Sequence, residues 1–368
     1  MLTKVEIKNI NAIRNSEFDF SKAKYQYKNN MVFNDEIVNP IAFYGTNGSG
    51  KSSFLTAISQ LISLMADDPS QLRAFVPHLR STKKKDKFLL QATEKSSIKL
   101  FFKIQKVNYV YFVETSIQGY ISREKLICNN EEVFVRNKDI YSYNGNEKKV
   151  PSEMFPILRT LNLETNDQII HLCYEFLSNI GFIDASKKTY QLKISMQKSY
   201  KDIIVENSNA IKAILSKYKE FPLYDVYSAT NELGEKEYYV NIKHKSGELV
   251  LPWSVISSGM ENQSMLLSAV LSLPENGVLI IDELEDALHP LSIIDFINAV
   301  KEKNIQLIFS SHNTYILQSL RPDQIIFAHW EEGYSKYKRL SEIYPNIREV
   351  NNIEKMYLSN LFDEDIKK

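Results

Sequence analysis

The stretch Gly45-Thr-Asn-Gly-Ser-Gly-Lys51-Ser52 decides the fold of this chain, because it matches G-x-x-x-x-G-K-[ST] between a short apolar run, 41–44, and a segment with helically spaced apolar residues, 54–65. In that context the glycines let backbone N–H groups face phosphate oxygens, and the start of a helix adds partial positive charge. Lys51 would neutralise phosphate charge, and Ser52 would offer a hydroxyl to Mg²⁺. The stretch therefore predicts a phosphate-binding loop for ATP, and a chance glycine turn before a helix is the alternative. The expected ATP contacts are Gly45, Thr46, Asn47, Gly48, Ser49, Gly50, Lys51, Ser52 and Ser53.

A second segment, Val278-Leu-Ile-Ile-Asp282-Glu283, is an apolar run typical of a buried strand, and it ends in two acids. Burying carboxylates at the end of such a strand costs free energy unless a cation lies next to them. We expect Asp282 to hold Mg²⁺ through water and Glu283 to act as the catalytic residue that polarises the attacking water. Asp-Glu after a strand is by itself also typical of a surface loop, but together with the phosphate-binding loop it predicts a Walker B motif.

Ser257-Ser258-Gly259-Met260-Glu261 begins a helix that Pro274 closes, and it allows two interpretations. Ser258 and Glu261 have the spacing of a capping box, so the segment can be a helix start and nothing more. We favour a signature motif, in which Ser258 and Gly259 grip the γ-phosphate of ATP held by another subunit. The order of this helix, Pro274, the apolar strand and the two acids supports the signature.

His312 follows the apolar run Gln306-Leu-Ile-Phe, at the place where a switch histidine contacts the γ-phosphate, and we expect it to be catalytic. His289 follows the Walker B acids, and there an interface or structural role is favoured over a catalytic one. Gln91 is the best-placed glutamine to sense Mg²⁺ between the Walker motifs.

One segment carries a basic patch, which is explained by a solvated loop, with contact to nucleic acid or a partner as the alternative. Its residues are Arg73, His78, Arg80, Lys83, Lys84, Lys85 and Lys87.

The composition limits where the protein works and what it binds. Lys+Arg and Asp+Glu number 45 each, so no net charge attracts nucleic acid or an anionic membrane, and any such binding must be local. Cys128 and Cys173 form no close-spaced metal pattern. No apolar run approaches the roughly 18 residues that span a bilayer, and the first residues lack the apolar block of a signal peptide. We therefore expect a cytoplasmic protein that does not bind membranes.

The periodicity predicts an α/β fold in three parts. Residues 1–150 form an N-terminal ATPase lobe, with an antiparallel meander from 96 to 142. Residues 151–222 form an inserted helical lobe. Residues 223–368 form a C-terminal ATPase lobe that begins with two or three strands and continues with alternating helices and buried strands, which is typical of a parallel sheet.

Four stretches, GTNGSGKSS, ISSGMENQ, VLIIDELEDALHPL and QLIFSSHNT, together resemble the ABC-type AAA-family ATPases of bacterial abortive-infection and restriction-linked loci, such as the RloA and AbiLii proteins. Met260, where many signatures have a second glycine, departs from the pattern. The resemblance implies an ABC-type P-loop ATPase head related to OLD and SMC or RecF heads, which dimerises around ATP and Mg²⁺. It also implies an anti-phage sensor that controls a separate effector, often a Toprim nuclease.

Two other functions compete with this one: a RecF-like or SMC-like repair ATPase that acts directly on DNA, and a transporter subunit. The long separation of the phosphate-binding loop from the signature argues against a transporter cassette, and the missing long heptads argue against an SMC arm. We expect no nuclease activity in the chain itself. Its only Toprim-like acidic triplet outside the ATP site, Asp363-Glu364-Asp365, lies three residues from the chain end.

Overall fold

The computed structural model describes residues 1–25, 27–28, 32–33, 36–65, 79–84, 87–92, 94–193, 199–217, 224–244, 247–359 and 361–362, with the backbone alone for 33, 79–84, 87–92 and 244. The chain divides into two compact units. The first contains Met1–Ser178 and Leu320–Lys368, and the second contains Asn179–Ser319.

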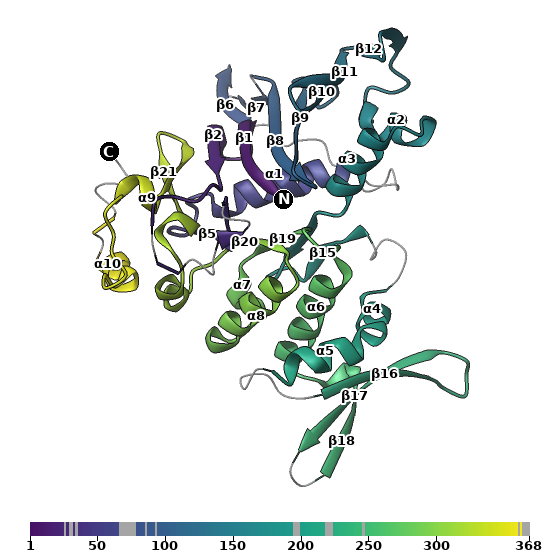
Figure 1. Cartoon of the computed structure of the whole chain (residues 1–368), viewed down its shortest axis with the longest axis vertical. Helices are drawn as coiled ribbons and strands as arrows, with labels where there is room; N and C mark the ends of the chain where they lie inside the picture. Colours follow the sequence, from purple (N-terminus) through teal and green to yellow (C-terminus); the bar gives the residue numbers. More distant parts are fainter. Residues whose placement is uncertain are drawn as a thin grey trace. The chain divides into compact units, whose positions relative to one another are not determined.

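The first unit is built on a mixed, mainly antiparallel sheet. Among the described residues its strand order is β13-β12-β11-β10-β9-β8-β1-β2-β22-β21-β5, and Figure 1 shows β2, β1, β8 and β9 side by side. The strands are β1 Leu2–Ile10, β2 Ile13–Asp19, β5 Ile41–Tyr44, β8 Ser96–Ile104, β9 Val107–Thr115, β10 Ile121–Cys128, β11 Glu131–Asn137, β12 Ile140–Tyr143, β13 Asn146–Lys149, β21 Ile325–Glu331 and β22 Tyr334–Arg339. Two short pairs lie outside this sheet: β3 Val32–Phe33 with β4 Ile37–Val38, and β6 Leu79–Lys84 with β7 Lys87–Ala92.

The predicted meander is confirmed, because β8 to β12 pair antiparallel in chain order. Ile98, Leu100 and Phe102 are buried, whereas Lys99 and Phe101 between them are half-buried, as expected for a strand with one face on the core. The ring of Phe102 stacks on Phe176, with centroids 4.6 Å apart. The meander therefore packs one face against a helix that follows it in sequence.

That helix belongs to a pair, α2 Ile157–Glu164 and α3 Gln168–Ser178. The buried carboxylate of Glu124 on β10 accepts the N–H groups of Ile157 at 2.6 Å and Leu158 at 3.0 Å, and it also accepts the hydroxyl of Tyr111 at 2.9 Å. These N–H groups are among the first of α2, which have no partner within the helix. A side chain of the sheet thus caps the helix and fixes its position.

The helix after the glycine-rich turn, α1 Lys51–Leu64, forms as predicted. Phe54 stacks on Phe43 of β5 with centroids 4.6 Å apart and lies 4.4 Å from the ring of Phe18 on β2. The helically spaced residues Leu55 and Ile58 are also fully buried. The helix is therefore held against the sheet by the face that its periodicity indicated.

The end of the chain completes the first unit with η6 Pro322–Gln324, α9 Leu340–Ile343 and α10 Ile353–Leu358. Arg321 and Asp323 are fully buried and form a two-bonded ion pair, with Nε and Nη2 of the arginine each 2.8 Å from a carboxylate oxygen. Asp323 also accepts the N–H of Ala23 at 2.8 Å. This pair ties the C-terminal segment to the strand region near the N-terminus.

The second unit contains the strand order β20-β19-β14-β15, in which β14, β19 and β20 run parallel and β15 is antiparallel. Its strands are β14 Gly181–Asp184, β15 Thr189–Gln191, β19 Val278–Asp282 and β20 Gln306–Ser310. Its helices are α4 Tyr200–Glu206, α5 Ser208–Leu215, η4 Trp253–Val255, α6 Ser258–Ser272, α7 Leu284–Ala287, α8 Pro290–Glu302 and η5 Thr314–Ser319. The predicted alternation of helix and buried strand after Trp253 is confirmed.

A separate antiparallel sheet belongs to the same unit: β16 Tyr224–Thr230, β17 Lys236–His244 and β18 Gly247–Pro252. Figure 1 shows it extending away from α4, α5 and α6. Gly234, between β16 and β17, and Gly247, at the start of β18, have positive φ. Both β18 and the end of β16 are largely exposed.

The structure differs from the expected organisation in three places. The expected helical lobe 151–222 is divided between the two units after Ser178, so α2 and α3 belong to the first unit. Strands β14 and β15 lie inside the stretch 151–222 that was expected to be helical, because a four-residue apolar strand cannot be told from part of a buried helix by periodicity. The residues from Leu320 onward group with the N-terminal unit, since β21 and β22 pair with β5 and β2. Within the described part of the chain, no helix is both long and apolar enough to cross a membrane.

Candidate functional site

In the first unit, the glycine-rich stretch forms a tight loop between β5 and α1. Gly50 adopts φ 97° directly before the helix, and a Cβ at this position would lie 1.8 Å from Ser335 Oγ. Gly45 has φ 148°, and a Cβ there would lie 2.2 Å from the carbonyl oxygen of Ala328. Both glycines are therefore required by backbone conformation and by space. Thr46, Asn47 and Gly48 at the tip are exposed and accessible to a ligand.

Lys51 folds over this loop, and its side chain is almost fully buried. Its Nζ donates to the carbonyl oxygens of Gly45 at 2.9 Å and Thr46 at 3.1 Å. Ser49 is 1% exposed, and its Oγ has no hydrogen-bond partner among the described residues. An ammonium group, a buried unpaired hydroxyl and the first N–H groups of a 14-residue helix converge on one loop, which fits the binding of phosphate.

In the second unit, the two acids predicted as Walker B lie at the carboxyl end of β19, whose five residues are all buried. Ser310 at the end of β20 is fully buried, and its hydroxyl donates to Asp282 Oδ1 and accepts the N–H of Glu283 at 2.9 Å. Glu283 has φ 55°, a left-handed conformation that is uncommon for a residue other than glycine. This conformation turns the chain from β19 into α7, which begins at Leu284.

His312 follows β20 and is brought to the same edge. Its N–H donates to the carboxylate of Glu285, which lies two residues after Glu283. Burial, together with the charges of Glu283 and Glu285, raises the pKa of Asp286. The structure thus brings Asp282, Glu283 and His312 together at the ends of neighbouring parallel strands, where the sequence predicted them.

The signature segment starts α6, but its cap differs from the expected one. Ser257 is the N-cap, and its hydroxyl accepts the N–H of Met260 at 3.3 Å. Ser258 does not cap the helix, and neither does Glu261, whose carboxylate accepts hydrogen bonds from Tyr200 at 2.8 Å and from Trp253 at 3.3 Å. The capping-box interpretation of Ser258 and Glu261 is therefore wrong, and Ser258 and Gly259 are exposed at the helix N-terminus.

Asp184 lies beside the predicted acids but was not predicted as a site residue from the sequence. It ends β14 directly opposite Asp282, and the N–H of Ala185 donates to the Asp282 carbonyl at 3.0 Å. Although burial opposes ionisation, hydrogen bonds from Lys187, with Nζ at 2.5 Å, lower the pKa of Asp184. Its signal in the sequence was Phe182-Ile183-Asp184, an apolar run that ends in an acid like the one before Asp282.

Other candidates are placed only in part. Gln91 lies on β7, where the structure describes the backbone alone, so its proposed Mg²⁺ contact remains a prediction. The side chains of the basic patch and the triplet 363–365 are likewise outside the described residues. His289 is exposed and precedes α8 as its N-cap residue. Among the described side chains, no group of three or more His, Cys, Asp or Glu is arranged to hold a metal.

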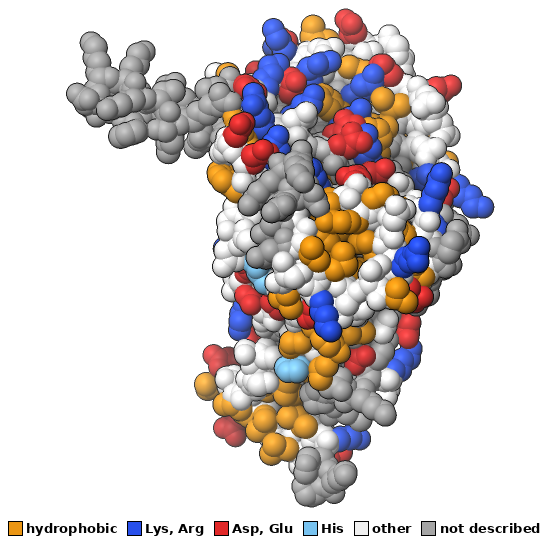
Figure 2. All heavy atoms as spheres, turned by 90° about the vertical axis from the view of Figure 1, so that its left-hand side faces the viewer, with side chains coloured by type: hydrophobic (Ala, Val, Ile, Leu, Met, Phe, Trp, Pro, Cys, Tyr) orange, Lys and Arg blue, Asp and Glu red, His pale blue; other side chains and the backbone are white. Residues whose placement is uncertain are grey.

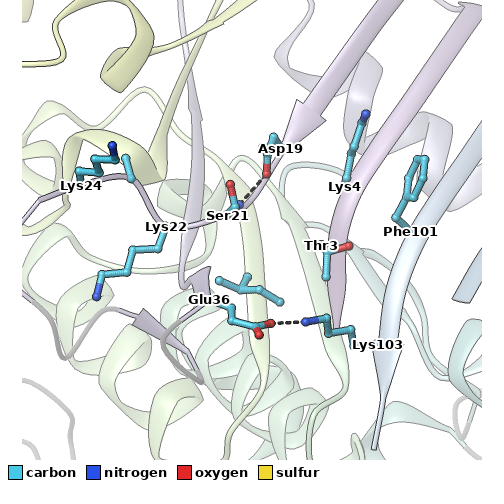
Figure 3. Close-up of a pocket in the computed structure, with 11 residues that line it drawn as sticks. Thr3, Lys4, Asp19, Ser21, Lys22, Lys24, Glu36, Phe101 and Lys103 are labelled. Carbon is cyan, nitrogen blue, oxygen red and sulfur yellow. Dashed lines mark hydrogen bonds and ion pairs between the residues drawn. The ribbon is translucent and has the colours of Figure 1, made fainter. Parts of the chain in front are cut away.

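A cavity of about 760 Å³ in the first unit contains no residue of the glycine-rich loop. Figure 3 shows Lys103 paired with Glu36 across it, and Lys22 and Lys24 pointing away from Lys4 and Phe101. Lys4 is itself paired with Glu6 at 3.0 Å and Glu17 at 2.7 Å. The cations therefore do not converge, and the cavity is not a second phosphate site.

On the face drawn in Figure 2, acidic and basic side chains are interspersed and form no continuous basic surface.

The fold is that of an ABC-type P-loop ATPase head. It is similar to the structure described as "SmcHead bound to the C-winged helix domain of ScpA", with a TM-score of 0.52 and 16% identity over 93% of this chain and 99% of that chain. The SMC head domain from Thermotoga maritima gives a TM-score of 0.49 and 14% identity over 92% and 98% of the two chains. Residues 41–318 match the family described as "AAA domain, putative AbiEii toxin, Type IV TA system", and the chain belongs to this family. No curated protein matches its sequence.

Proposed function

We propose that this chain binds ATP through Gly45–Ser53 and hydrolyses it to ADP and phosphate. The observation that carries the proposal is the loop itself, in which Lys51, the buried hydroxyl of Ser49 and the N-terminus of α1 all point to a phosphate ligand. Membership of an AAA-domain family supports this assignment. The buried strand before the loop and the packed helix after it hold these donors in place before a ligand arrives.

The catalytic roles follow from the turn at the end of β19. Glu283 accepts a proton from the attacking water, and His312 contacts the γ-phosphate. Ser52 and Asp282 would hold Mg²⁺, which would neutralise charge on the phosphates. Hydrogen bonds from Ser310 link the Asp282 carboxylate to the Glu283 backbone. They hold Asp282, proposed to bind Mg²⁺, in position relative to Glu283, proposed to accept the proton.

Two copies of the chain complete the site in this proposal. Ser258 and Gly259 lie exposed at the N-terminus of α6, a 15-residue helix, and Ser257 has already taken the capping role. The Ser258 hydroxyl and the first N–H groups of the helix are therefore accessible to the γ-phosphate of ATP bound by a second copy. ATP then closes a homodimer and hydrolysis releases it.

The output of the ATPase passes to a separate effector protein. The family description names a putative toxin of a type IV toxin–antitoxin system. The role in bacterial anti-phage defence and the separate effector nuclease, often of the Toprim type, rest on the resemblance of the four sequence stretches to ATPases of abortive-infection loci. Stable co-purification of the chain with the product of a neighbouring gene tests this step, and tight, salt-sensitive DNA binding by the isolated chain would instead favour a repair ATPase.

Three variants test the ATPase itself. Lys51→Ala should abolish ATP binding with the fold intact, and Glu283→Gln should bind ATP but hydrolyse it slowly, because the amide cannot accept a proton. ATP should hold Glu283→Gln as a dimer, and adding Ser258→Arg should prevent this by blocking the second copy. Nucleotide titration, phosphate release and light scattering measure these effects. Unchanged ATP affinity in folded Lys51→Ala would exclude the loop as the binding site.

A further inference from the structure

The phosphate-binding loop is supported from outside its own strand and helix by β22. The hydroxyl of Tyr337 donates to the carbonyl oxygen of Gly50 at 2.7 Å. Its ring is held in place by Phe18, with centroids 4.9 Å apart, and by Phe43, with centroids 6.3 Å apart. A long aromatic side chain from near the end of the chain thus reaches the last residue before α1.

The same strand also limits the space around Gly50. A Cβ on Gly50 would lie 1.8 Å from Ser335 Oγ and 3.2 Å from the Tyr337 hydroxyl, so β22 closes against the loop. Ser335 is 2% exposed, and its N–H donates to the carbonyl of Ala12 at 2.8 Å. Because β22 is anchored to the start of β2, it is a fixed wall and not a loose end of the chain.

Strand β22 affects ligand binding because it contacts the loop at Gly50. This glycine precedes Lys51 and has the left-handed conformation that turns the chain into α1, so its peptide orientation sets the direction of the N–H groups that face phosphate. A hydroxyl bonded to the Gly50 carbonyl restricts rotation of that peptide. Burial raises the pKa of Tyr337, so its hydroxyl is protonated and able to donate at neutral pH.

We propose that Tyr337 is a positioning residue for nucleotide binding, which holds the Gly50–Lys51 peptide in the phosphate-binding orientation while Ser335 closes the space behind it. The inference rests on the proposed ATP binding. Both residues lie outside the region 41–318 that matches the family, so this support comes from the C-terminal hairpin β21–β22.

Tyr337→Phe removes the hydroxyl and keeps the ring packing. We expect ATP to bind roughly 3- to 10-fold more weakly, the effect of one lost hydrogen bond. The rate at saturating ATP should stay within about twofold, because the variant acts on binding and not on the chemical step. Amide hydrogen exchange within 45–53 should become faster. Ser335→Val, which pushes methyl groups toward Gly50, should weaken ATP binding more.

Tyr25→Phe is the matched control. Tyr25 is buried in the same unit, and its hydroxyl donates to a backbone carbonyl, that of Tyr344, at 3.1 Å. It should lose similar thermal stability and bind ATP like the wild type. If the wild type binds ATP and Lys51→Ala does not, but Tyr337→Phe matches the wild type in affinity and loop exchange, the positioning role is overturned and the ATP site stands. If the wild type itself binds no ATP, the proposed function fails first.

Discussion

Ser310 offers a direct test of how the Walker B turn is held. Its hydroxyl is fully buried and bridges the Asp282 carboxylate and the Glu283 N–H, so Ser310→Ala removes one hydrogen bond to a charged group and one to an amide. Such bonds contribute about 1.5–3 and 0.5–1.5 kcal/mol, so the free energy of unfolding should fall by about 2–4.5 kcal/mol.

The effect on hydrolysis should be larger than the effect on ATP binding. Without Ser310, Asp282 and Glu283 are free to shift relative to each other, and a misplacement of about 1 Å costs up to roughly 100-fold in rate. We expect kcat to fall about 10- to 100-fold, while ATP affinity changes less than about threefold, because Gly45–Ser53 holds the phosphates.

The assays are urea unfolding, ATP titration and steady-state phosphate release on the same preparation. Ser311→Ala is the control, because Ser311 is equally buried but its hydroxyl accepts only the N–H of Asn313, at 2.9 Å, within its own turn. A folded Ser310→Ala variant with wild-type kcat, or one no slower than Ser311→Ala, would refute the argument that this serine fixes the two acids.

Two further predictions concern buried charges. Asp184→Asn should destabilise the protein most at neutral pH, because a lowered pKa stabilises the fold only where the carboxylate is ionised. The difference in unfolding free energy from the wild type should therefore shrink as pH falls below the ordinary aspartate pKa of 3.8. Urea unfolding between pH 7 and 3 measures this difference, and a difference that grows in acid contradicts the prediction. Asp323→Ala should lower the free energy of unfolding by about 3–5 kcal/mol, because it removes the carboxylate partner of buried Arg321. Asp225→Ala breaks the partly exposed pair with Lys212 and should cost less than about 1 kcal/mol. Equal losses of stability in thermal unfolding would show that burial does not set the difference.

The sequence by itself determined the features that local chemistry dictates. Gly45–Ser52 predicted its strand, loop and helix, because this spacing of glycines and a lysine suits a phosphate at a helix start. The alternation in 96–142 predicted an antiparallel meander, and the apolar run before Asp282 predicted a buried strand. Each of these signals lies within a short window, so no knowledge of distant contacts was needed.

Only the tertiary structure decided which distant residues support these motifs. Asp184 lies beside Asp282 because β14 pairs with β19, and nothing within four apolar residues distinguishes such a strand from a piece of helix. Ser257 and not Ser258 caps α6, since Glu261 is bound by Tyr200 and Trp253 instead of the helix start. Tyr337 reaches Gly50 across 287 positions of sequence. Contacts of this kind depend on strand order and packing, which a pattern of residues along the chain does not specify.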